Sequence, residues 1–322
     1  MPRELDQQLD NRPAPSKSEA NAQAQANDVA QVSDQAQTND QTETTVKDRF
    51  SVDGLRVFEA LRTPVIDQIT RHVSVRSFDS ERQLPEGTVE MMMAAAQSAS
   101  TSSNFQSWSA VIIRDPERKQ KMQELCDNQR FIGQAPLFIA FCADSSRHKW
   151  VTEQKGYPFG SNYLELLLIS VIDSALACQN AALAAESMGL GCCMVGAIRN
   201  HARDVAKFLE LPDGVFATIG LAVGYPSSKN EVKPRLPQSV VVHEEKYSTT
   251  TRAEGIAAYD AVMQKTDIYK GRKIHIPGLT PDPEQDTAPY GWSEHTARRM
   301  ARGNDMRRDL AVFLKEIGFV LE

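Results

Sequence analysis

His72, Ser74 and Arg76 stand at alternate positions of the chain, with Val73 and Val75 between them. Successive side chains of an extended segment point to opposite sides, so the three polar groups would share one side. A guanidinium fork and a hydroxyl donor are groups that bind phosphate well. The pattern also fits a charged strand face in solvent, and these residues alone do not separate the two interpretations.

A second polar segment, residues 98–109, reads SASTSSNFQSWS. It holds the hydroxyl and amide side chains of Ser102, Ser103, Asn104 and Gln106. Such groups hydrogen-bond a heterocycle that offers many donors and acceptors, but they equally form turns and helix caps. The segment is therefore a candidate for ligand binding with an equally good structural explanation.

Two later segments also allow both a ligand-binding and a purely structural interpretation. Residues 189–197 read GLGCCMVGA, and their small side chains either let the backbone approach a planar ligand or serve tight helix–strand packing. Lys233 and Arg235 flank a proline in a loop that either clamps a phosphate or is ordinary solvated surface.

Several other kinds of chemistry find no support. The five cysteines are odd in number and form no CxxC, which argues against a disulfide framework or a structural zinc site. Cys192 and Cys193 are better explained as small apolar residues of a strand than as a redox pair. The six histidines show no metal-ligand spacing, so we expect no metal. The GxGxxG, Walker, HExxH and GxSxG motifs are missing as well.

The elements that must position these groups follow from periodicity. Helical patterns occur at 58–69, where Pro64 kinks or interrupts the helix, at 85–96, begun by Pro85 and Glu86, and at 161–188, 200–209, 253–266 and 292–317. Short β-prone runs predict strands at 108–114, 136–143, 192–195 and 215–223. This mixture indicates an α+β or three-layer α/β domain.

The helix at 161–188 is apolar around most of its circumference, so we expect it to be buried on nearly all sides. It is then either the core helix of the domain or part of a subunit interface. Eight polar residues interrupt residues 164–188, which argues against a membrane span.

Charge and composition divide the chain at about residue 49. The net charge is -6, and most of it belongs to residues 1–49, a low-complexity segment rich in glutamine, asparagine and alanine. We expect 1–49 to be a disordered leader, with a partner-binding or targeting arm as the alternative, and 50–322 to be the folded domain. Its near-neutral charge gives no reason to expect nucleic acid or a membrane surface as partner. Lacking a signal pattern, the protein is expected in the reducing cytoplasm.

The order of the motifs is more specific than any one of them. RHxSxR, then SSNxQSW, Asn128-Gln129, AAESMGLG, GYP and KPRLP together resemble the nitroreductase family, and within it the larger oxygen-insensitive nitroreductase and flavin reductase group. The resemblance runs from about Val65 to Tyr247 and continues more weakly over 290–319.

The resemblance implies a homodimeric three-layer sandwich with a central, mainly antiparallel sheet, long core helices and a helical extension over about 250–322. It also implies bound FMN. Its implied cofactor ligands are His72, Val73 through its backbone, Ser74, Arg76, Ser102, Ser103, Asn104, Gln106, Gln129, Met194, Val195, Gly196, Ala197, Lys233 and Arg235. The serine-rich segment would reach the partner's FMN.

The activity implied by the resemblance is ping-pong, two-electron reduction of nitroaromatics, quinones or free flavin by NAD(P)H. The chemistry belongs to FMN N5, so no protein residue is expected to be catalytic. NADPH is the expected reductant in preference to NADH, although the arginine-rich loop of relatives is not reproduced; Arg298, Arg299 and Arg307 are candidates to replace it. A specialised flavoenzyme with one substrate and a flavin-binding dimeric module without turnover remain alternatives.

Overall fold

The computed structural model describes residues 49–52, 61–302 and 307–321, all within one compact unit, Asp40–Glu322. Residues 1–48 of the predicted leader lie outside the described residues, and so does Phe58, the first residue of the helix predicted at 58–69. Arg49, which the composition assigns to the leader, is described and buried.

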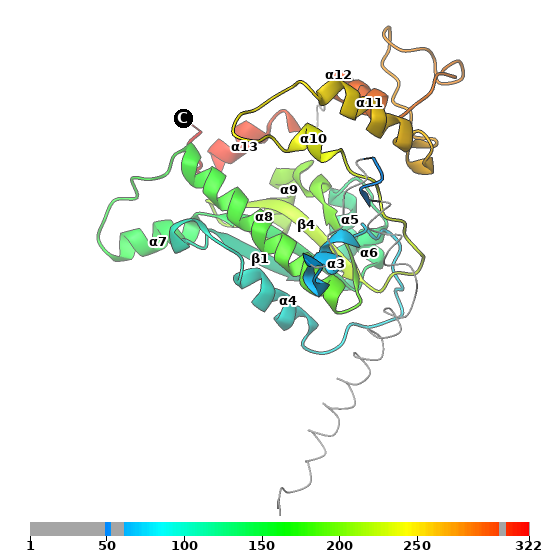
Figure 1. Ribbon diagram of the computed structural model, residues 1–322. Coiled ribbons are helices and arrows are strands. Elements are labelled where there is room, and N and C mark those ends of the chain that lie inside the picture. The colour runs from blue at the N-terminus through cyan, green and yellow to red at the C-terminus, as the bar shows by residue number, and fades with distance from the viewer. Residues whose placement is uncertain (1–48, 53–60, 303–306, 322) are drawn as a thin grey trace, which may run out of the picture. The chain divides into compact units, whose positions relative to one another are not determined.

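A four-stranded antiparallel sheet forms the centre of the domain (Figure 1). The order of its strands is β1-β2-β4-β3. Its strands are β1 (Trp108–Ile113), β2 (Leu137–Asp144), β3 (Gly191–Val195) and β4 (Val215–Gly224). All four coincide with the predicted strands to within a few residues. The antiparallel pairing confirms the expected mixture of helices and a mainly antiparallel sheet.

Helices cover both faces of this sheet because its central strands are apolar on both sides. Along β2, Phe138, Ala140 and Cys142 face one apolar cluster, while Leu137, Ile139 and Phe141 face another. The first cluster includes residues of α5 (Pro116–Leu125), α6 (Phe131–Gln134), the 3-10 turn η3 (Gly196–Arg199) and α9 (Ala202–Phe208). The second includes residues of α4 (Thr88–Gln97) and α8 (Leu164–Ser187).

The long helix α8 is buried on one face only. Ala177, Ala181 and Ala185 pack under the sheet, whereas Leu164, Leu168, Ile172 and Leu176 follow one another at four-residue steps and remain 41–57% exposed. The expectation of burial on nearly all sides is therefore wrong for the single chain, because no element of the described chain covers this stripe. Among the described helices, α8 alone is long and apolar enough to cross a membrane, a property that core helices share.

Several helix ends differ from the predicted ones for local reasons. α4 begins at Thr88, and Pro85 and Glu86 precede it, because Gly87 at the N-cap has a left-handed φ of 81°. Pro64 starts α3 (Pro64–Thr70) rather than kinking it, with the Thr63 hydroxyl capping the helix. The predicted helix at 292–317 is two helices, α12 (Trp292–Arg302) and α13 (Leu310–Glu316).

The remaining described helices are the 3-10 turn η2 (Ser102–Asn104), α7 (Ser146–Gln154), α10 (Gln238–Val241), α11 (Arg252–Met263) and the 3-10 turn η4 (Asp267–Tyr269). α13 packs Phe313 and Leu314 against Leu167 of α8 and Phe216 of β4. The C-terminal helix is thus part of the folded domain.

Candidate functional site

A strongly basic cavity of about 640 Å³ lies where two distant chain segments meet. His72, Val73, Ser74 and Arg76 line it from one segment, and residues 229–235 line it from another. Among the described lining residues, seven are basic and one, Glu231, is acidic; the basic ones are Arg49, Arg76, Lys229, Lys233, Arg235, Lys265 and Arg272. This excess of cations gives the cavity a positive charge that would favour an anionic ligand.

The segment with His72, Ser74 and Arg76 is extended, as its alternation predicts. The Val75 N–H donates to Cys192 O of β3 at 2.9 Å, and the Val75 side chain enters the core. Gly191 permits this close approach, since a Cβ there would lie 2.6 Å from Val75 Cγ2. The buried Val75 thus leaves the polar neighbours on its two sides facing the cavity.

The cations of the cavity destabilise one another. Burial lowers the pKa of Lys233 below its ordinary 10.5, and the charges of Arg76, Arg272 and Arg235 lower it further. Burial likewise lowers the pKa of Arg49 to about 10, with Arg235 adding to the effect and Glu186 opposing it. A bound dianion would relieve this repulsion.

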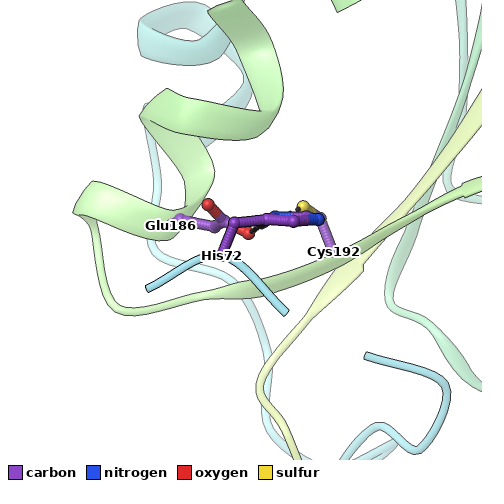
Figure 2. Close-up of side chains that lie close together, drawn as sticks. All are labelled: His72, Glu186 and Cys192. Carbon is purple, nitrogen blue, oxygen red and sulfur yellow. Dashed lines mark hydrogen bonds and ion pairs between the residues drawn. The ribbon is translucent and has the colours of Figure 1, made fainter. Parts of the chain in front are cut away.

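The His72 ring contacts the carboxylate of Glu186. Its Nδ1 lies 2.5 Å from Glu186 Oε1, and the Cys192 thiol lies 3.6 Å from the same oxygen (Figure 2). The Glu186 side chain comes from the end of α8 and is only 10% exposed. Among the described residues, these three could also ligate a metal by their spacing, but the histidine and carboxylate already pair with each other. We therefore interpret Glu186 as the group that orients His72.

Cys192 and Cys193 lie buried in β3. Burial raises the pKa of both thiols, and Glu186 raises that of Cys192 further. The structure does bring Arg76 and Lys233 near Cys193, which the sequence did not reveal, but their charges are outweighed by burial. Both residues are small apolar members of the core.

The other predicted cofactor ligands lie outside the described lining of this cavity. Ser102, Ser103, Asn104 and Gln106 are exposed on a loop of which three residues have positive φ. Gln129 is half-buried and lies two residues before the start of α6. Met194, Val195, Gly196 and Ala197 form the end of β3 and the start of η3.

The serine-rich loop is fixed by one buried carboxylate of α8. Asp173 is 1% exposed, and its Oδ2 accepts the Thr101 hydroxyl at 2.7 Å and the Ser107 N–H at 3.0 Å. Its Oδ1 accepts the Ser102 N–H at 3.2 Å. The loop therefore presents its polar side chains from a rigid base.

Two of the three candidate arginines are engaged within the fold. Arg298 is buried and pairs with Asp286 at 2.5 Å and with Glu294 at 2.6 Å. Arg307 donates to Gly196 O at 3.0 Å and to Asn200 Oδ1 at 2.7 Å. Arg299 is exposed on α12.

Six charged groups at or behind the cavity were not predicted from the sequence: Arg49, Glu186, Lys229, Glu231, Lys265 and Arg272. Glu186 belongs to the AAESMGLG motif, which assigns it no role, and the composition places Arg49 in the leader. No local pattern marks Lys265 or Arg272, because only the tertiary fold brings them to the cavity.

Comparison with known proteins identifies the class to which this helix-covered sheet and basic cavity belong: the chain is a member of the nitroreductase family. The family model described as "Nitroreductase family" matches residues 69–225, and "Nitroreductase family, C-terminal domain" matches residues 233–322. The resemblance drawn from the motifs is confirmed.

The alignments with individual relatives span most of the length of each relative. An FMN reductase (NADPH) of Bacillus subtilis is 41% identical over 64% of this chain and 84% of the relative. An oxygen-insensitive NADPH nitroreductase of Salmonella typhimurium is 33% identical over 75% of this chain and 93% of the relative. The solved structure of NADPH:FMN oxidoreductase from Vibrio harveyi, complexed with NAD+, aligns with a TM-score of 0.69 and 30% identity over 81% of this chain and all of that one.

Proposed function

We propose that this chain is an FMN-dependent NAD(P)H oxidoreductase that reduces nitroaromatics, quinones or free flavin in two-electron steps. The observation that carries the proposal is the basic cavity, which unites the segments around Arg76 and Lys233. The names of the relatives, FMN reductase and NADPH nitroreductase among them, support the same cofactor and reductant.

The cavity fits the phosphate end of FMN. Arg76 offers a guanidinium fork, Ser74 a hydroxyl and His72 a ring oriented by Glu186, while Lys233 and Arg235 add charge from the opposite segment. FMN supplies the two-electron chemistry when it is bound, so the chain has to bind and orient the flavin and needs no nucleophile of its own. Residues 194–197 and Gln129 are proposed to approach the flavin ring.

We assign the additional phosphate of NADPH to two exposed cations that line the cavity, Lys265 and Arg272. Arg298 is buried with Asp286, and Arg307 holds Gly196, which leaves Arg299 as the exposed member of the predicted trio. On this basis NADPH is the proposed reductant in preference to NADH.

We further propose a three-layer homodimer in which each active site takes residues from both subunits. The exposed apolar stripe of α8 supplies a surface for a second copy of the chain. The exposed loop 102–106 lies outside the described lining of the chain's own cavity, as expected if it serves the partner's FMN. Sedimentation at the mass of a single 35.7 kDa chain would contradict this proposal. The cytoplasmic location stays a prediction.

A steady-state assay tests the proposed function. With NADPH varied at several fixed concentrations of a nitroarene or quinone, we expect parallel double-reciprocal lines, because reductant and acceptor occupy the same flavin face in turn. Turnover with none of the generic acceptors would instead indicate an enzyme with one dedicated substrate. Failure of NADPH and NADH to reduce the bound flavin would indicate a binding module without turnover.

The lowered pKa of Lys233 predicts how FMN affinity depends on pH. A bound phosphate stabilises the ammonium form, so binding raises the pKa of Lys233. FMN affinity should therefore fall as pH rises through the lowered pKa of the free protein, below the ordinary lysine value of 10.5. Fluorescence titration with FMN at a series of pH values measures the fall. Lys233→Arg keeps the charge and should flatten it; identical profiles for the two proteins would show that Lys233 is not responsible.

The buried thiols are expected to take no part in turnover. Replacing Cys192 and Cys193 together by serine should leave kcat for nitroarene reduction within about twofold, because both thiols are held protonated and serine retains their small size. A loss of kcat with FMN occupancy intact would show that a thiol participates.

A further inference from the structure

Arg49 lies at the cavity although it precedes residues 69–225, the part of the chain that the main family model matches. Its exposed fraction is 5%, which is unusual for an arginine. The residue therefore places a buried cation from an N-terminal segment against the candidate cofactor site.

The contacts of Arg49 join the two segments that line the cavity. Its Nε donates to Thr70 O at 2.7 Å, and its Nη2 donates to His72 O. In the other direction, the Arg235 N–H donates to the carbonyl of Arg49 at 2.9 Å. One residue thus fixes the backbone at the start of the 72–76 segment and the backbone of the Lys233–Arg235 loop.

The charge of Arg49 links this residue to the binding of an anion in the cavity. A buried guanidinium beside a second arginine is costly in the free protein, and the cost appears as the lowered pKa of Arg49. Carbonyl acceptors and the negative charge of Glu186 compensate this cost in part. An anion in the cavity would compensate it further, which links Arg49 to the occupied state of the site.

We propose that Arg49 is a positioning residue for the phosphate of the bound flavin, joining the 72–76 segment to the Lys233–Arg235 loop so that both face one phosphate group. The inference rests on the proposed function, namely that the cavity holds FMN. It assigns part of the cofactor site to the segment that precedes the family match. Arg49 acts through His72 and Arg235.

The test compares two flavins that differ only in the phosphate. The full-length apoprotein is titrated with FMN and with riboflavin, and flavin fluorescence reports both dissociation constants. Arg49→Ala should weaken FMN binding by about 10- to 100-fold, in line with the range for charged hydrogen bonds. Riboflavin binding should change by less than about threefold, because riboflavin has no phosphate to be positioned.

Matched variants separate positioning from a general structural role. Arg118→Ala removes another arginine that donates to a backbone carbonyl, that of Phe208, and should leave both affinities unchanged. Arg49→Lys retains the charge and should recover part of the FMN affinity. If Arg49→Ala does not fold, Arg49→Lys must itself show a loss confined to FMN.

The outcomes distinguish this inference from the proposed function. Equal losses of FMN and riboflavin affinity, or no loss of either, would overturn the role of Arg49. Arg76→Ala in the same titration tests the cavity itself. If Arg76→Ala loses its preference for FMN and Arg49→Ala does not, only the inference fails; if wild type shows no preference for FMN over riboflavin, both fail.

Discussion

Replacing Arg76 by alanine is expected to leave the protein largely free of FMN after dialysis. The variant loses the guanidinium that faces the cavity beside Ser74 and Lys233. A hydrogen bond to a charged group contributes about 1.5 to 3 kcal/mol, so FMN affinity should fall by about 10- to 150-fold. The flavin-to-protein absorbance ratio before and after dialysis measures the loss.

Arg71→Ala is the matched control for this prediction. Arg71 lies five residues earlier, at the end of α3, and donates to Asp67 O and Gln68 Oε1 rather than lining the cavity. It should retain its flavin as wild type does. Full FMN occupancy of Arg76→Ala after dialysis would mean that the cofactor phosphate lies elsewhere.

The largest loss of stability outside the apolar core is expected from Asp173→Ala. This change leaves the Thr101 hydroxyl and the N–H groups of Ser102 and Ser107 without their acceptor. The Ser107 donor is buried, whereas those of Thr101 and Ser102 are partly buried. A buried donor left unpaired costs about 1 to 3 kcal/mol and a partly buried one costs less, so the free energy of unfolding should fall by about 2 kcal/mol or more. A lower urea midpoint of the apoprotein reports this loss.

The loop that Asp173 fixes carries Ser102, Ser103, Asn104 and Gln106, so FMN retention should fall along with stability. Asp173→Asn keeps one acceptor oxygen and should show a smaller effect on both. Glu165→Ala, which removes an exposed carboxylate from the first turn of the same helix, should change neither. A urea midpoint for Asp173→Ala equal to that of Glu165→Ala would refute the anchoring role.

The strands and α8 were predictable from sequence because their signals are local. Residues 137–143 of β2 are an uninterrupted apolar run, and the strand is buried along its whole length. α8 ends at Ser187, two residues before Gly189. The start of α4 was misplaced because a left-handed Gly87 interrupts an otherwise suitable helix start. The hydrophobic periodicity of a sequence carries no information on the φ angle of one residue.

The candidate site was predictable where a resemblance covered it and not elsewhere. His72, Ser74, Arg76, Lys233 and Arg235 were expected to bind one FMN, and the fold brings all five to one cavity. Arg49, Lys265 and Arg272 complete the cavity through contacts between segments far apart in sequence. Burial and long-range charge, which no motif encodes, decide these positions.

The exposed apolar stripe of α8 shows a second limit of prediction from sequence. Its residues Leu164, Leu168, Ile172 and Leu176 predicted burial, yet the single chain leaves them exposed. Sequence reports that a surface prefers to be covered, but not whether the chain itself or a second copy covers it.

Anaerobic titration of the purified, FMN-reconstituted protein tests the central claim most directly. The account predicts an oxidised flavin spectrum that NADPH bleaches at lower concentration than NADH, and that a nitroarene or quinone then restores. A protein that binds no flavin, or a bound flavin that neither nicotinamide bleaches, would contradict it.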